Sequence, residues 1–155
     1  MGFEAFRAIA VPDKIHISQL HKTLNRAPFR HLSSDSPGWD YFEYRDSSHI
    51  IELELDPDGE LSFRFALCQP GTVDQALLEM ISALGSQSSA LIKLIGQPPG
   101  SDTATEFLPP YNGLQSALFN AIKTRRDRWQ AAFGSTTAVL TCAEAVERFM
   151  LGSEH

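Results

Sequence analysis

Two glutamates on one predicted strand are the residues of this sequence best spaced for acid/base chemistry. Glu52 and Glu54 alternate with apolar residues between positions 50 and 55, which places both side chains on one face of the strand, about 7 Å apart. Paired carboxylates can serve as a general acid and a general base when a cleft encloses them. Their predicted cross-strand neighbours, Arg64 and Ser62, are instead typical of a solvated sheet face. An enzyme that uses Glu52 and Glu54 therefore stays an alternative hypothesis.

Cysteine chemistry provides a second enzyme alternative. Cys68 follows a predicted strand and the sequence contains five histidines, so a thiol/imidazole pair near Cys68 is a candidate site. The sequence has no Gly-x-Ser-x-Gly elbow for a serine nucleophile. Cys68 and Cys142 both lie among apolar residues, which is typical of buried, reduced thiols. We assign no catalytic residue and leave open whether the two cysteines lie close together.

The histidines and the acidic turn residues do not have the spacing of metal ligands. The histidines form neither an i, i+4 pair on a helix nor a His-x-His pair on a strand. Asp56, Asp58 and Glu60 surround a tight turn, but the remaining ligand positions of a calcium loop are missing. Glycine-rich phosphate-binding patterns are also missing from the sequence. We therefore predict no metal site and no cofactor. The five histidines are His16, His21, His31, His49 and His155.

The balance of charge favours a basic protein over nucleic acid as a partner. The formal net charge is −6, whereas a nucleic-acid partner requires a basic face. The one basic cluster, at positions 123–128, precedes Trp129, and Arg125 shares a helix face with that tryptophan. We interpret the cluster as an exposed helix face whose positive charge compensates the protein's own acidic residues. An acidic surface can attract a basic protein over long range.

The sequence favours a cytoplasmic protein. Its first residues do not form a basic segment followed by an apolar one, and no apolar stretch is long enough to cross a bilayer. We therefore predict no membrane partner.

Alternation of apolar and polar residues predicts a mostly antiparallel sheet. The clearest signal is Asp56-Pro57-Asp58-Gly59, because proline presets the second position of a type I turn and glycine accepts the left-handed conformation. If Asp56 pairs with Glu60, Leu53 faces Phe63 on the core side and Glu52 faces Arg64 on the other side. The predicted strands cover residues 3–11, 39–44, 50–55, 61–67 and 90–95, with a further segment at 136–141.

Helical spacing of apolar residues predicts four helices. The first begins at Ser18 and stops before Pro28. The second begins after Thr72, which forms a capping box with Gln75, and ends before Gly85. The other two cover residues 114–133 and 141–150.

Together these elements predict an α+β fold with a sheet of about five strands, helices packed on one face and a helical C-terminal segment. Apolar residues make up 43% and charged residues 21% of the chain, which is typical of a folded globular domain. We predict one domain over residues 1–155. Residues 1–95 would form the sheet and two helices, residues 96–113 a proline-rich loop, and residues 114–155 the C-terminal helices.

The segment of residues 39–95, in which a hairpin leads through Cys68-Gln69-Pro70-Gly71 into the helix that starts at Val73, resembles small bacterial immunity proteins of toxin systems. The resemblance is one of architecture and covers about a third of the chain. It implies a non-catalytic protein that binds and blocks a toxin, and the acidic balance suits a basic partner.

The sequence therefore favours a protein-binding protein, as a monomer or a homodimer. We expect the binding surface on the polar side of the hairpin, with Glu52, Glu54 and Arg64, and on the loop around Tyr111. The helix face with Arg125 and Trp129 is the next candidate. An acidic secretion-type chaperone is the alternative binding function, and it would require a dimer and a hydrophobic groove.

Overall fold

The computed structural model describes residues 5–33, 37–67, 69, 71–95 and 104–133. Within these residues the chain forms seven strands and three α-helices, with a short 3₁₀ turn, η1 (Lys14–His16), before the first helix. The strands are β1 (Ala5–Val11), β2 (Phe29–Ser33), β3 (Asp40–Arg45), β4 (Ile50–Leu55), β5 (Leu61–Ala66), β6 (Leu91–Ile95) and β7 (Ala104–Phe107). The helices are α1 (Ile17–Leu24), α2 (Val73–Ser88) and α3 (Leu114–Phe133).

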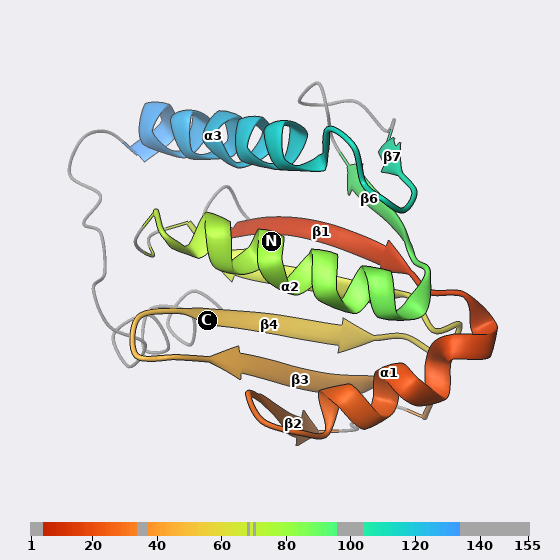
Figure 1. The fold of residues 1–155 in the computed structure, drawn as a ribbon. Helices are drawn as coiled ribbons and strands as arrows, with labels where there is room; N and C mark the ends of the chain where they lie inside the picture. Colours follow the sequence, from red (N-terminus) through yellow and green to blue (C-terminus); the bar gives the residue numbers. More distant parts are fainter. Residues whose placement is uncertain (1–4, 34–36, 68, 70, 96–103, 134–155) are drawn as a thin grey trace.

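All seven strands belong to one antiparallel sheet in the order β2-β3-β4-β5-β1-β6-β7 (Figure 1). The predicted α+β class is confirmed, but the prediction of about five strands is too low. The two additional strands, β2 and β7, are the edges of the sheet. Edge strands are paired on one side only, so their sequences need not show the apolar pattern of interior strands. β7 also corrects the prediction that residues 96–113 form a loop without a strand.

The hairpin of β4 and β5 has the predicted register. Leu53 lies opposite Phe63 and Glu52 lies opposite Arg64. The amide of Asp56 donates to the carbonyl oxygen of Glu60 at 3.0 Å, and Gly59 has φ +89°, a backbone conformation that glycine adopts without steric cost. The turn therefore fixes which side chains of the two strands face the core.

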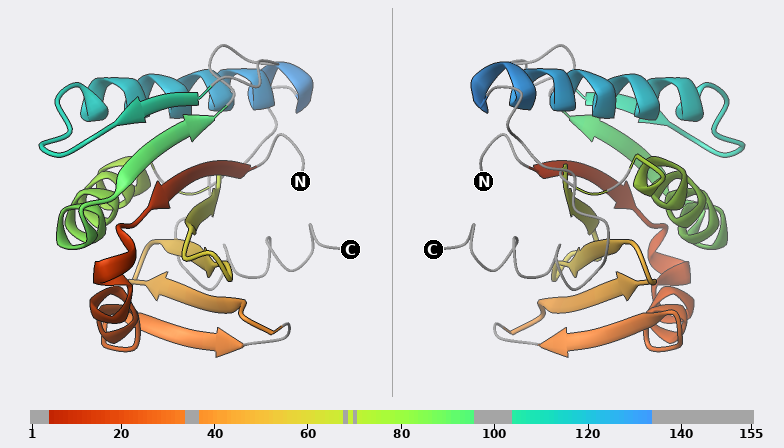
Figure 2. Two further views of the ribbon diagram at one scale, coloured as in Figure 1. Left: turned by 90° about the vertical axis from the view of Figure 1, so that its right-hand side faces the viewer. Right: turned by 90° about the vertical axis from the view of Figure 1, so that its left-hand side faces the viewer.

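The core lies between the sheet and the helices. Figure 2 shows α1 and α2 on the same side of the sheet, as predicted, and α3 packs beside α2. Alternate residues of each central strand are buried against the helices, which follows from the two-residue repeat of a strand. From the strands the core receives Phe6, Ala8, Ala10, Phe42, Ile51, Leu53, Leu55, Leu61, Phe63, Phe65, Ile92 and Leu94; from α3 it receives Leu114, Leu118, Ala121, Ile122 and Trp129.

Helix α2 has the predicted apolar stripe but not the predicted ends. Thr72 makes no side-chain capping hydrogen bond, and its backbone is already right-handed helical (φ −62°, ψ −15°). The predicted capping box with Gln75 is therefore wrong, because the Thr72 hydroxyl bonds elsewhere, to His49. The helix also continues through Gly85 to Ser88. Its stripe of Val73, Leu77, Met80, Ile81 and Leu84 is buried as predicted.

Helix α1 is shifted by one residue from the predicted start at Ser18. It begins at Ile17, directly after η1, whose first turn is capped by the carboxylate of Asp13 accepting from the amide of Ile15 at 3.3 Å. The chain thus enters α1 through a capped turn rather than through a serine cap.

Several predictions lie outside the described residues. These are the state of Cys68 and Cys142, the strand at residues 136–141 and the helix at residues 141–150. Among the residues that are described, none of the helices combines the length and the apolar character that crossing a membrane requires.

Candidate functional site

The predicted hairpin residues do share the sheet face opposite the core. Arg64 Nη1 donates to Glu52 Oε2 at 2.9 Å, and Arg7 Nη2 on β1 lies 3.8 Å from Glu54 Oε2. The side chains of Arg7, Glu52, Glu54 and Arg64 are between 18% and 48% exposed. The structure therefore joins the three predicted hairpin residues and adds Arg7 to them.

A second group of ion pairs lies beside this one on the same face, on β3 and the edge strand β2. Glu43 lies opposite both Glu52 on β4 and Arg30 on β2, and its side chain is only 8% exposed. Glu43 Oε1 accepts from Arg30 Nη2 at 3.1 Å and from Arg45 Nε at 3.0 Å. A buried carboxylate requires such partners, because burial without them is costly. We call Arg7, Arg30, Glu43, Arg45, Glu52, Glu54 and Arg64 the charged sheet face.

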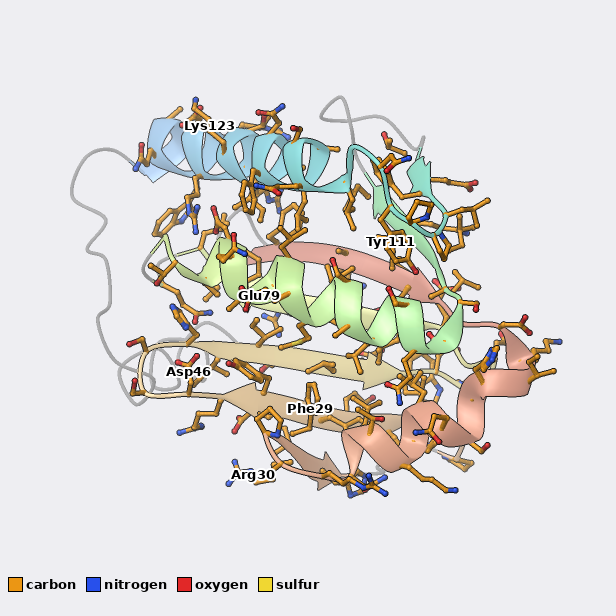
Figure 3. The ribbon with its side chains drawn as sticks, viewed as in Figure 1. Phe29, Arg30, Asp46, Glu79, Tyr111 and Lys123 are labelled. Carbon is orange, nitrogen blue, oxygen red and sulfur yellow. The ribbon has the colours of Figure 1, made fainter. Side chains whose placement is uncertain are left out.

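The aromatic residues of the predicted site are in the core. Tyr111 is 9% exposed and donates its hydroxyl to the carbonyl oxygen of Ala90 at 2.7 Å; Figure 3 shows it among the side chains between α2 and the β6–β7 end of the sheet. Trp129 is 8% exposed and packs from α3. Arg125 is half-buried on the same helix. The structure therefore does not bring Tyr111, Arg125 and Trp129 together with the charged sheet face.

Two residues of the basic cluster on α3 are paired with acidic residues. Arg126 makes two parallel hydrogen bonds to Asp74 of α2, at 2.6 and 2.7 Å, and Lys123 donates to Asp127 at 2.8 Å. Both pairs agree with the interpretation of the cluster as a helix face whose positive charge compensates the protein's own acidic residues.

A second polar cluster lies where the β3–β4 hairpin meets the start of α2. His49 Nδ1 is 3.0 Å from Asp46 Oδ2, and His49 Nε2 is 2.7 Å from Thr72 Oγ1. His49 is 9% exposed, whereas Thr72 is exposed. We call these three residues the hydroxyl–imidazole–carboxylate chain. Figure 3 labels Asp46 at the hairpin end on the side where α2 begins.

The hairpin turn holds the carboxylate of Asp46 in place. Asp46 Oδ1 accepts from the amides of Ser48 and His49, both at 2.8 Å, and Asp46 Oδ2 accepts from the Tyr44 hydroxyl at 3.1 Å. Burial alone would raise the pKa of Asp46, but the hydrogen bonds from His49, Ser48 and Tyr44 outweigh burial and lower the pKa from 3.8 to about 2. Asp46 is therefore ionised at neutral pH.

The ionised carboxylate determines which ring nitrogen of neutral His49 carries the proton. Because Asp46 can only accept, Nδ1 donates to it and Nε2 is left as an acceptor. The Thr72 hydroxyl then donates to Nε2. The sequence does not predict this arrangement, because its patterns suggest the histidines only as possible metal ligands or partners of Cys68, and suggest Thr72 as a helix cap. Asp46 and His49 are close in sequence, but Thr72 is 23 residues from His49, so no local pattern joins them.

Neither enzyme alternative gains support from the described residues. Glu52 and Glu54 are held by Arg64 and Arg7, and Cys68 lies outside the described part of the chain. Within that part, no group of three or more His, Cys, Asp or Glu side chains is placed to hold a metal ion.

Comparison with known proteins provides no relative for this chain. No model of a protein family, no curated protein and no solved structure matches it.

Replacing Asp46 with asparagine is expected to reduce stability in a pH-dependent way. The native pKa of about 2 lies below the reference value of 3.8, so the carboxylate stabilises the fold above pH 4 and loses this contribution as the pH falls toward 2. Asp46 is 36% exposed, so we discount for solvent screening and expect a loss of about 1 kcal/mol at pH 7.

Urea unfolding at pH 7, 5 and 3 measures this effect, with Asp58→Asn in the β4–β5 turn as the control. The difference between wild type and Asp46→Asn should shrink toward pH 3. A difference that stays constant with pH would contradict the assignment of the effect to the carboxylate charge.

Proposed function

We propose that this chain is a protein-binding protein that docks a basic protein on its charged sheet face. The observation that supports this proposal is the ladder of ion pairs that runs across the sheet from Arg30 through Glu43, and from Glu52 through Arg64. Charged side chains that are already held in pairs lose little conformational freedom when a partner binds. The ladder thus offers a partner an ordered pattern of charge.

The charges on the sheet face and the net charge of the whole chain contribute differently to such binding. The charged sheet face is nearly balanced, with four arginines against three glutamates, so it provides register and specificity more than attraction. The net charge of −6 attracts a basic protein over distance and raises the association rate. A basic toxin is the partner class that the resemblance to immunity proteins implies, and blocking it requires no chemistry from this chain.

The chaperone alternative finds less support. A chaperone groove needs contiguous exposed apolar side chains. The large apolar residues that are exposed in the described part of the chain are Ile15, Leu32 and Leu108, and they belong to η1, to β2 and to the segment after β7. Three separate segments do not supply a groove.

Reversing Glu52 and Glu54 to lysine tests the proposal. The test partner is the basic protein that the immobilised chain captures from extracts of its source cells, purified for kinetic measurement. The double reversal should slow association about tenfold, weaken its dependence on salt, and speed dissociation, because the pairs with Arg64 and Arg7 are lost. The free energy of unfolding should fall by about 1 kcal/mol.

The matched control is the double variant Asp58→Lys, Asp127→Lys, which changes the net charge equally at exposed positions in the β4–β5 turn and on α3. The control should slow association but leave dissociation unchanged. Equal dissociation rates for wild type and both variants would rule out the charged sheet face as the docking surface. A captured partner that is acidic would contradict the proposed partner class.

A further inference from the structure

The geometry points to a nucleophilic site at the start of α2, in which the Thr72 hydroxyl attacks carboxylic esters, His49 is the general base and Asp46 is a positioning residue. This inference goes beyond the proposed binding function and does not rest on it. The site uses a different part of the molecule, the junction between the β3–β4 hairpin and α2.

Thr72 meets the two geometric requirements of an activated nucleophile. Its hydroxyl lies 2.7 Å from His49 Nε2, within the range in which a base can take the proton directly. The residue is exposed, so a substrate carbonyl can approach it from solvent. The base itself is shielded, since the His49 side chain is only 11% exposed.

Helix capping does not explain the contact between the Thr72 hydroxyl and His49. A capping threonine accepts a hydrogen bond from an amide of the first turn, whereas Thr72 makes no such bond. Its hydroxyl is directed at His49 instead. The competing explanation is a purely structural tie between the hairpin and α2, and the experiment below separates the two.

The surrounding charges favour the reaction. Burial, the hydrogen bond to Asp46 and the negative charges of Asp46 and Glu79 raise the pKa of Tyr44, so Tyr44 remains a donor to Asp46 at neutral pH. Asp74, two residues beyond Thr72, is paired with Arg126, which offsets a carboxylate that would repel a developing oxyanion. The positive end of the α2 dipole adds to this effect.

The reaction follows from these positions. Thr72 Oγ1 attacks the carbonyl carbon of an ester while its proton passes to His49 Nε2. The bond to the leaving oxygen then breaks, the alcohol departs with that proton, and an acyl ester remains on Thr72. Water attacks this ester, His49 Nε2 accepts the water proton, and the carboxylic acid leaves as Thr72 recovers a proton. The net reaction consumes one ester and one water and yields one acid and one alcohol.

The experiment uses p-nitrophenyl acetate as the probe and the full chain as the protein. Release of nitrophenol is followed by absorbance, and the acetylated residue is located by mass spectrometry of peptides. Acetylation should occur at Thr72 in the wild type and, in Thr72→Ser, at the same position. Thr72→Val has the same shape without the hydroxyl and should lose the modification.

Removing the base should slow acylation without removing the nucleophile. His49→Gln should acylate position 72 about 10² to 10⁴ times more slowly, the range that general base catalysis supplies. Thr72→Val and Asp46→Asn decide the question if His49→Gln does not fold, since both preserve the shape of the residues they replace.

The positioning role of Asp46 is tested by a measurement that a merely structural role would leave unchanged. The nitrogen chemical shifts of the His49 ring should show a protonated Nδ1 in the wild type and a mixture of the two neutral forms in Asp46→Asn, accompanied by slower acylation. Acetylation at residues other than Thr72, or at Thr72 with equal rates in folded wild type and His49→Gln, would overturn the inference. So would a folded wild type that is not acetylated at all.

Discussion

Replacing Gln69 with alanine should lower the free energy of unfolding by about 4 kcal/mol. Gln69 is 2% exposed, and its side chain bonds both backbone groups of Ile50 at 2.7 Å, accepting from the amide and donating to the carbonyl. β5 ends at Ala66, so the Gln69 amide takes the place of a neighbouring strand at the first residue of β4. Alanine would leave two buried backbone groups unpaired and open a cavity.

Urea denaturation of the purified variant measures this loss, and Gln75→Ala is the control. Gln75 is an exposed helix residue whose side chain donates to Glu79 of the same helix, so its replacement should change stability by less than about 0.5 kcal/mol. A loss at position 69 no larger than at position 75 would show that water replaces the side-chain amide.

Alanine at Gly85 should destabilise the fold by about 2 kcal/mol, although glycine to alanine normally stabilises a helix. A Cβ atom at this position would lie 2.7 Å from the Tyr111 hydroxyl oxygen, 3.2 Å from Tyr111 Cζ and 3.3 Å from Ile92 Cδ1. Tyr111 cannot easily move away, because its hydroxyl is bound to the carbonyl oxygen of Ala90. Overpacking therefore outweighs the gain of about 1 kcal/mol in helix propensity.

A double-mutant cycle with Tyr111→Phe identifies the clash. Phenylalanine removes the oxygen that the new methyl group would meet, so Gly85→Ala should cost less than about 1 kcal/mol in that background. Thermal unfolding of the four proteins gives the coupling energy. Equal costs in the two backgrounds would mean that Ile92, and not Tyr111, limits the space at position 85.

Local signals in the sequence predicted those parts of the fold that are determined locally. The turn from Asp56 to Gly59 specifies a backbone geometry by itself, and the register of β4 and β5, including the contact of Glu52 with Arg64, follows from that turn. The stripe of α2 was predictable for the same reason, because helical periodicity is contained within one segment.

The missed features depend on contacts between distant segments. β7 has four residues and is a strand because β6 provides a partner. Tyr111 was expected on the surface because it follows two prolines, yet its burial depends on Gly85 in α2 and on Ala90 between α2 and β6. The bond between Thr72 and His49 likewise joins two segments that are distant in the sequence. Each residue alone has an ordinary local explanation, Thr72 as a helix cap and His49 as a hairpin residue.

The place of β1 in the sheet has a consequence for the order in which the sheet can assemble during translation. β1 precedes the other six described strands in the chain, but its two neighbours in the sheet are β5 and β6, and β6 ends at Ile95. At ordinary synthesis rates of about 5 to 20 residues per second, β1 waits on the order of ten seconds for its second partner. The meander of β2 to β5 can pair earlier, since its strands follow one another in sequence. The nascent chain therefore carries an incomplete sheet, in which the side of β1 that pairs with β6 stays unpaired until residue 95 has emerged from the ribosome.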